Sequence, residues 1–191
     1  MKTQEILENF CNDKKHAEDV RDISAIIFDE VDKNIKKMSP KQKNYLEKAA
    51  LLHDIGYSVS SKKHNKYSQK LILDNDLDNF TQREREIISC IARYHRGGLP
   101  NKKEHEIYCH FDKKERKIVK RLGGILRIAD SLNKNHICLI KDIKIKFDEI
   151  NNITEFYLVS KNVDYRPEIN FTKKDLFEKG FKTQVVFKFE A

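Results

Sequence analysis

The chain contains 191 residues, and its 38 Lys and Arg against 30 Asp and Glu give a formal net charge of +8. Apolar residues make up 39% of the chain and are spread along its whole length, which is enough for a core and excludes wholesale disorder. No segment approaches the ~18 uncharged apolar residues of a membrane span, and no apolar signal core follows the first residues. We therefore expect a cytoplasmic protein without a membrane partner.

Hydrophobic periodicity predicts a helical body over residues 1–136. Apolar side chains recur at spacings of three and four residues, the pattern of helices with one buried face. The segments with this pattern are residues 13–36, 39–54, 67–73, 81–94 and 113–132. Ser39-Pro40 is a helix start, Thr81 to Glu84 forms a capping box, and Gly56 is placed to cap the second helix. Polar loops are expected over residues 58–63 and 101–112.

After Asn135 the period of the pattern changes to two, which predicts strands. Alternating residues indicate strands over 143–147, 156–159 and 185–189, with a short helix capped by Thr172 and ended by Gly180 before the last strand. We expect a mainly α protein, with a helical domain over residues 1–138 and a small α+β subdomain over 139–191. The subdomain is expected to contribute stability or substrate shape but no catalytic group.

The cysteines and the charge distribution narrow the chemistry further. Cys11, Cys90, Cys109 and Cys138 lie far apart, which excludes a zinc ribbon or a CxxC redox site and favours reduced thiols. The 29 lysines against nine arginines are typical of a solvated Lys-rich surface. However, residues 101–139 hold ten basic and five acidic side chains, which leaves an anionic ligand open as the alternative.

The most specific chemical feature is the pair His53-Asp54. Adjacent side chains on a helix normally point about 100° apart, but at a last turn beside a glycine both can converge on one point. His16, His95 and Asp130 lie on or at the end of other predicted helices. Mixed imidazole and carboxylate ligands suit divalent Mn, Fe, Co, Ni or Mg better than a thiolate zinc site. The alternative is an ordinary His–Asp hydrogen bond at a helix end.

These residues resemble a known family. The order His16, His53-Asp54, Asp130 is similar to the signature of HD-domain metal-dependent phosphohydrolases. The segments 49–57 (AALLHDIGY), 93–97 (RYHRG) and 125–133 (ILRIADSLN) resemble the C-terminal HD region of the exopolyphosphatase/guanosine pentaphosphatase (Ppx/GppA) family. The likeness covers about residues 10–136. The chain has six glycines and no Gly-rich phosphate loop, so it looks like an HD region that stands alone, without the family's ATPase-like domains.

The resemblance implies an HD-domain helical bundle of five or more helices and a metal-dependent phosphohydrolase. One divalent ion would be held by His16, His53, Asp54 and Asp130, and Asp54 would also orient or deprotonate the attacking water. The substrate would be a phosphoester or phosphoanhydride such as a nucleotide, an alarmone or a polyphosphate-like anion. The alternative is a non-catalytic anion-binding or regulatory module with a vestigial metal site. A homodimer stays open, and no nucleic-acid motif is present.

Six residues near the expected ligands are candidates for gripping phosphate oxygens: Lys63, His64, Arg93, His95, Arg96 and Arg127. For each basic residue the alternative is a surface charge or a helix salt bridge. His105 and His110 are expected to be exposed, His136 to cap a helix end, and Tyr57 to serve in packing.

A departure from the family pattern bears on the number of ions. Where the relatives carry a His-rich segment, this chain has Asn65 and Tyr67, and neither a weak amide oxygen nor a neutral phenol is a good ligand at pH 7. We therefore expect at most one tightly held ion, with His64 and His95 turned toward a substrate phosphate.

Overall fold

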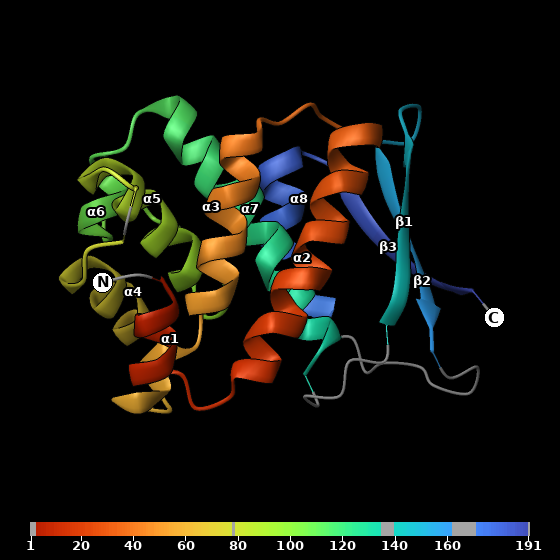
Figure 1. Cartoon of the computed structure of the whole chain (residues 1–191). Helices are drawn as coiled ribbons and strands as arrows, with labels where there is room; N and C mark the ends of the chain where they lie inside the picture. The colour runs from red at the N-terminus through yellow and green to blue at the C-terminus, as the bar shows by residue number, and fades with distance from the viewer. Residues whose placement is uncertain (1–2, 78, 135–139, 162–170, 191) are drawn as a thin grey trace.

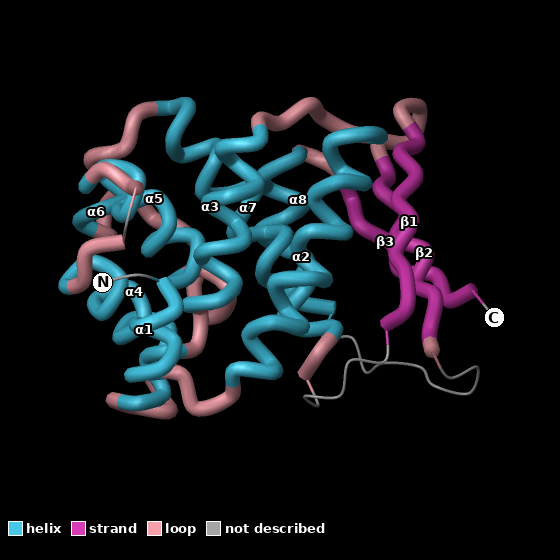
Figure 2. The backbone as a smooth tube through the Cα atoms, viewed as in Figure 1, coloured by secondary structure: helices cyan, strands magenta, loops and turns pink. Residues whose placement is uncertain are grey.

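The computed structural model describes residues 3–77, 79–134, 140–161 and 171–190. Helices form most of the molecule, and a small sheet lies at one side of them, beyond α2 (Lys14–Asn34) and α8 (Asp175–Phe181) (Figure 1). The backbone view separates the two parts clearly, with the strands gathered at one end of the helical body (Figure 2). The prediction of a mainly α fold followed by a small α+β unit is confirmed.

All five predicted helices are present, with bounds close to those expected. After α2 they are α3 (Pro40–Leu52), α4 (His64–Asp74), α5 (Gln82–Arg93) and α7 (Lys113–Leu132). Ser39, Thr81 and Asp112 each begin a helix with a complete capping box, in which the side chains at the cap and three residues later satisfy each other's backbone N–H groups. Local signals therefore define where these helices start.

Three short elements were not predicted. They are α1 (Thr3–Phe10), the 3₁₀ helix η1 (Ile55–Ser58) and α6 (Glu106–Cys109). α1 buries only Ile6 and Leu7, and α6 is a single turn inside the polar segment, so neither has enough apolar periodicity to be recognised. His105, expected to be exposed, is half-buried before α6 and shares a hydrogen bond of 2.7 Å with the Tyr94 hydroxyl.

Gly56 has a different role from the predicted cap of α3. The residue that ends α3 is His53, and Gly56 lies within η1. A Cβ atom placed on Gly56 would lie 2.0 Å from the His64 carbonyl oxygen and 2.5 Å from the Ser68 nitrogen. The absence of a side chain is what allows η1 to contact the backbone of α4 directly, and the Gly56 N–H donates to the Ser68 hydroxyl over 2.9 Å.

The sheet contains β1 (Ile140–Asp148), β2 (Ile153–Ser160) and β3 (Gln184–Glu190) in the order β1-β2-β3. β1 and β2 form an antiparallel hairpin in which Ile143 pairs with Leu158, whereas β2 and β3 are parallel. The alternating apolar side chains of β1 pack against α2, as its period of two predicted. The three predicted strands are therefore confirmed, and each is longer than expected.

The connection from β2 to β3 passes over α7 and differs from the prediction in detail. Thr172 lies in a second 3₁₀ helix, η2 (Phe171–Lys174), and α8 continues through Gly180 to end at Lys182 in the left-handed conformation, with φ 59°. Gly124 of α7 allows this close packing, because a Cβ atom there would lie 2.6 Å from the backbone of Phe177. Within the described residues, no helix is both long and apolar enough to cross a membrane.

Candidate metal centre

Six side chains reach one point from the ends of different helices. His16 lies in the first turn of α2, and Asp130 lies in the last turn of α7. His53 ends α3 and Asp54 begins η1, so the turn between these elements presents both side chains of the pair. His64 is the first residue of α4, and His95 follows the end of α5. Helix ends suit this purpose because the backbone turns there and adjacent side chains can converge.

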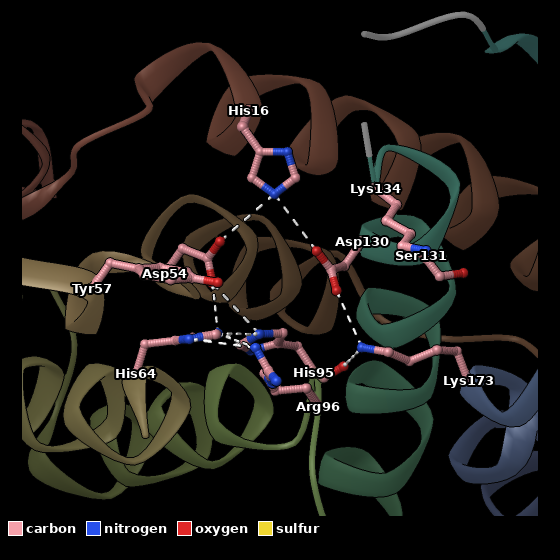
Figure 3. A pocket seen from close by; sticks show the side chains of 10 residues that line it. All are labelled: His16, Asp54, Tyr57, His64, His95, Arg96, Asp130, Ser131, Lys134 and Lys173. Carbon is pink, nitrogen blue, oxygen red and sulfur yellow. Dashed lines mark hydrogen bonds and ion pairs between the residues drawn. The ribbon is translucent and has the colours of Figure 1, made fainter. Parts of the chain in front are cut away.

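The structure brings the four expected ligands together, and Figure 3 shows how His16 faces both Asp54 and Asp130. The Nε2 atom of His16 lies 3.7 Å from Asp54 Oδ2 and 3.5 Å from Asp130 Oδ1. The Nε2 atom of His53 lies 3.3 Å from Asp54 Oδ2 and 3.6 Å from Asp130 Oδ1. Two imidazole nitrogens and two carboxylate oxygens therefore surround one small volume.

The orientation of the imidazoles is set by their other ring nitrogen. The Nδ1 atoms of His53, His64 and His95 lie 2.7 to 2.9 Å from the carbonyl oxygens three residues earlier in the chain, those of Ala50, Ser61 and Ala92. A ring that donates its Nδ1–H to a carbonyl keeps the Nε2 lone pair free. In all three residues this lone pair is directed into the cluster, which is the arrangement that a metal ligand requires.

His16 has a different anchor. Its Nδ1 atom lies 3.2 Å from the side-chain nitrogen of Asn133, a fully buried residue just beyond α7. The carbonyl oxygen of the same amide is buried and has no hydrogen-bond partner among the described residues. Because the two ends of an amide are assigned from their partners, the reversed amide would accept the Nδ1–H of His16, so that the Nε2 lone pair faces Asp54 and Asp130.

His64 and His95 approach the cluster from the opposite side. Their Nε2 atoms lie 3.2 Å apart, and they lie 3.2 Å and 3.5 Å from the second carboxylate oxygen of Asp54, Oδ1. Asp54 thus faces His16 and His53 with one oxygen and His64 and His95 with the other. The two later histidines face a carboxylate in addition to the pocket where a phosphate was expected.

The electrostatics of the cluster favour a bound cation. Burial raises the pKa of Asp54 and Asp130, but the neighbouring histidines outweigh it and hold both pKa values below the usual range. Burial lowers the pKa of His53, yet the two carboxylates outweigh it and hold that pKa well above its ordinary value. Burial lowers the pKa of His64, and that of His95 to about 3, so both are neutral at pH 7. The two ionised carboxylates and the neutral imidazoles of His64 and His95 are ligands suited to a divalent ion, and an ion bound at His53 would replace the proton that the carboxylates hold there.

Two orphaned atoms test whether a metal fits here. His53 Nε2 and Asp54 Oδ1 are buried and make no hydrogen bond within the described part of the chain. A buried polar atom without a hydrogen bond is costly. A cation on the His16 side of Asp54 would satisfy His53 Nε2, and a cation on the His64 side would satisfy Asp54 Oδ1. Two overlapping groups have ligand atoms within 4.8 Å of one another: His16, His53 and Asp130, and His53, Asp54 and His95. The residues present therefore fit a divalent metal ion.

A pocket of about 240 Å³ opens beside the cluster. Arg96, Lys134 and Lys173 contribute positive charge to its lining. The ammonium of Lys173 lies 3.3 Å from Asp130 Oδ2 and donates to the His95 carbonyl over 3.1 Å. The Arg96 guanidinium lies 3.4 Å from His64 Nε2. An anionic group at the cluster would therefore be met by basic side chains from three segments.

Of the six candidate phosphate-binding residues, three line this pocket and three do not. His64, His95 and Arg96 line it. Arg93 instead donates a hydrogen bond of 2.6 Å to Gln69 Oε1. Arg127 is buried, and its Nε lies 3.0 Å from Oδ1 of Asp175 in α8. Lys63 is exposed and only precedes α4. These three residues do not line the pocket, and phosphate binding by them stays a prediction.

Several residues at the site were missed. Tyr57, expected in packing alone, is 41% exposed and stacks on His64 with the ring centroids 3.9 Å apart. Lys173 brings a charged group from the C-terminal segment, which had been assigned no part in the chemistry. Asn133 lies one helical turn after Asp130, and this spacing is a sequence signal that places it near the ligands. No sequence signal places Lys173 there. The predictions for His136 and Cys138 concern residues outside the described part of the chain.

The fold is mainly α, and four imidazoles and two carboxylates form a candidate metal centre. The basic pocket beside this centre suits an anionic ligand. The family model described as Ppx/GppA phosphatase, domain III, matches residues 2–179. The chain belongs to this family, which confirms the resemblance seen in the sequence. A search of curated proteins found no match.

Proposed function

We propose that this protein is a metal-dependent phosphohydrolase of the HD type that acts on a phosphoester or phosphoanhydride. The observation that carries the proposal is the convergence of four imidazole Nε2 atoms on two ionised carboxylates, with His53 Nε2 and Asp54 Oδ1 buried and without a hydrogen bond among the described residues. The basic pocket beside this cluster supports an anionic substrate. Membership of a family described as phosphatases agrees with the proposal.

The first metal position is proposed at His16, His53, Asp54 and Asp130. A divalent ion, Mn, Mg, Fe, Co or Ni, would activate water and neutralise charge on the phosphoryl group there. The second set, Asp54 Oδ1 with His64 and His95, offers three ligand atoms instead of four. We therefore propose one tightly held ion, with a weaker second position at the set that the sequence had assigned to phosphate.

The protein's own groups supply the rest of the reaction. Asp54 orients the attacking water and accepts its proton, while Arg96, Lys134 and Lys173 bind the non-reacting phosphoryl oxygens. The water oxygen forms the new bond to phosphorus as the bond to the leaving oxygen breaks. That oxygen takes up a proton, and the products are an alcohol or a shorter phosphate and inorganic phosphate. Basic groups that bind the developing charge accelerate such a reaction through electrostatic stabilisation.

The test is phosphate release from a panel of nucleotides, (p)ppGpp and polyphosphate, each assayed with Mn, Mg, Co and Ni. We expect release that requires the metal and that Asp54→Asn lowers by at least ~100-fold, since general base catalysis contributes about that much. The exposed control Asp22→Asn should keep full activity. Binding of phosphorylated ligands without release from any of them would overturn the enzyme and favour the non-catalytic anion-binding module.

A further inference from the structure

A second cavity, which the proposed reaction does not use, adjoins the metal cluster. It measures about 200 Å³ and lies at the junction of α1 and α2. Cys11, Asn12 and Asp13 of that junction line it, together with three residues that also line the basic pocket: His16, Asp54 and Tyr57. We call it the junction pocket. A molecule seated at the metal cluster can therefore extend into either space.

The two cavities differ in charge. The basic pocket holds Arg96, Lys134 and Lys173, whereas the described residues that line the junction pocket include two carboxylates and neither Lys nor Arg. Figure 3 shows Lys134 and Lys173 on the Asp130 side of the cluster and Tyr57 on the other side, beyond Asp54. A second phosphate in the junction pocket would meet like charge without a basic partner. A chain of phosphates is thus disfavoured there.

The lining of the junction pocket suits an uncharged ring. Tyr57 forms part of the wall that both cavities share, and its stacking on His64 at an interplanar angle of 18° fixes the plane of its ring. The Asn12 amide offers hydrogen-bonding groups, the Asp13 carboxylate caps α2 by accepting from the His16 N–H, and Cys11 adds a half-buried thiol. A cavity of ~150 Å³ holds benzene, so this space has room for a sugar or a heterocycle.

We propose that the junction pocket binds a neutral ring of the substrate's organic part, such as the sugar or the base of a nucleoside, while its phosphate occupies the basic pocket. This inference rests on the proposed function and selects nucleotides over polyphosphate within it. The shared residues His16 and Asp54 then lie beside the bond that joins the two parts. Phosphate and ring are bound by different elements, the first by residues after α5 and around α7, the second by the α1–α2 junction.

The first experiment measures binding without any chemistry. Adenosine and guanosine, which carry no phosphate, are titrated into the protein by calorimetry, and inorganic phosphate is titrated separately. We expect one of the nucleosides to bind and to compete with its monophosphate. Asn12→Ala and Cys11→Phe should each weaken nucleoside binding by at least tenfold and leave phosphate binding unchanged. Cys109→Phe, at an exposed cysteine, is the matched control and should change neither.

The second experiment compares kcat/KM for nucleoside monophosphates and for tripolyphosphate in the Mn-loaded protein. We expect the nucleotide to be preferred, and Asn12→Ala to reduce that preference through KM. The exposed Asn12 keeps this test open even if Cys11→Phe fails to fold. Nucleoside binding without hydrolysis would support the pocket while refuting the proposed enzyme. Hydrolysis of tripolyphosphate in preference, with neither nucleoside bound, would overturn the pocket and keep the enzyme.

Discussion

The imidazoles at the cluster are oriented by the contacts of their Nδ1 atoms. Three of them use the carbonyl oxygen three residues earlier, a local contact that helix ends offer. The fourth, His16, depends on the side chain of Asn133, 117 residues away in the chain. A metal site whose ligands are held in this way loses little entropy when the ion binds. We therefore expect metal affinity to fall most when the distant contact between His16 and Asn133 is lost.

We expect Asn133→Leu to lower metal affinity by about 10–100-fold, which is typical when the outer partner of a ligand is removed. Asn133→Asp keeps an acceptor for the His16 Nδ1–H and should retain most of the affinity. Metal titration monitored by calorimetry measures both variants, and circular dichroism confirms that each is folded. Equal affinity in Asn133→Leu and the unmodified protein would show that this contact does not position His16.

The two sets of ligands on Asp54 are separable by mutation. We expect His53→Ala to abolish the tightly held ion, because His53 belongs to the four-ligand set, whereas His95→Ala should keep it and remove only the weaker second equivalent. Metal analysis after dialysis, at limiting and at saturating Mn, distinguishes them. Two equivalents retained with equal affinity in the unmodified protein would contradict the order proposed for the two positions.

At the scale of elements, η1 connects the two halves of the cluster. It follows directly from Asp54 and contacts the start of α4, where His64 lies. Gly56 makes this contact possible because the neighbouring backbone leaves no room for a side chain. The distance between Asp54 and His64 is therefore determined by the packing of one short helix.

We expect Gly56→Ala to destabilise the protein by about 1–3 kcal/mol, the usual cost of inserting atoms into packed structure, and to weaken metal binding as well. Gly98→Ala is the matched control, since a Cβ atom there would meet nothing within 4 Å. Urea unfolding gives the stability of both variants. An unchanged midpoint for Gly56→Ala would mean that η1 moves away from α4 without cost.

The second 3₁₀ helix, η2, provides adjacent lysines with different partners. Lys173 faces Asp130, whereas Lys174 donates to the Val185 carbonyl and pairs with Glu178. We expect Lys173→Met to raise KM about 10–100-fold, because a hydrogen bond to a charged group contributes about 1.5–3 kcal/mol. Lys174→Met should leave KM unchanged. Equal KM values for both variants would exclude Lys173 from phosphate binding.

The helices and the pair His53-Asp54 were predictable because their signals are local, whereas the full ligand set with His16 and Asp130 was implied by the resemblance to HD-domain phosphohydrolases. Periodicity, capping boxes and the pair His53-Asp54 can be read within a few residues of the chain. Lys173 could not be found, since it reaches Asp130 from 43 residues away through a tertiary contact. Arg93 and Arg96 show the same limit: their side chains leave one short segment in different directions, and sequence proximity to His95 does not reveal which one lines the pocket.

At the scale of the whole molecule, α2, α3, α4, α5 and α7 each place a side chain, at or next to a helix end, in the one cluster that would bind the cation. An ion that binds only the folded chain stabilises all of these elements together, by about 2.7 kcal/mol at a concentration of 100 times Kd. For a protein of this size that corresponds to a rise of about 5–11 °C in Tm. Scanning calorimetry with Mn and with a chelator measures the shift. The same shift in His53→Ala would place the stabilising ion elsewhere.

The parallel pairing of β2 with β3 has a consequence for how chain length can vary. An antiparallel partner is reached by a tight turn, whereas a parallel partner requires a long crossover, and here η2 and α8 lie within that crossover. The number of residues from Lys173 to Gln184 is therefore set jointly by the sheet and by the pocket. The turn between β1 and β2, where Ile150 is 95% exposed, has no such double constraint. Insertions at that turn are neutral for the pocket, whereas insertions between Lys173 and Gln184 displace either the lysine or the strand.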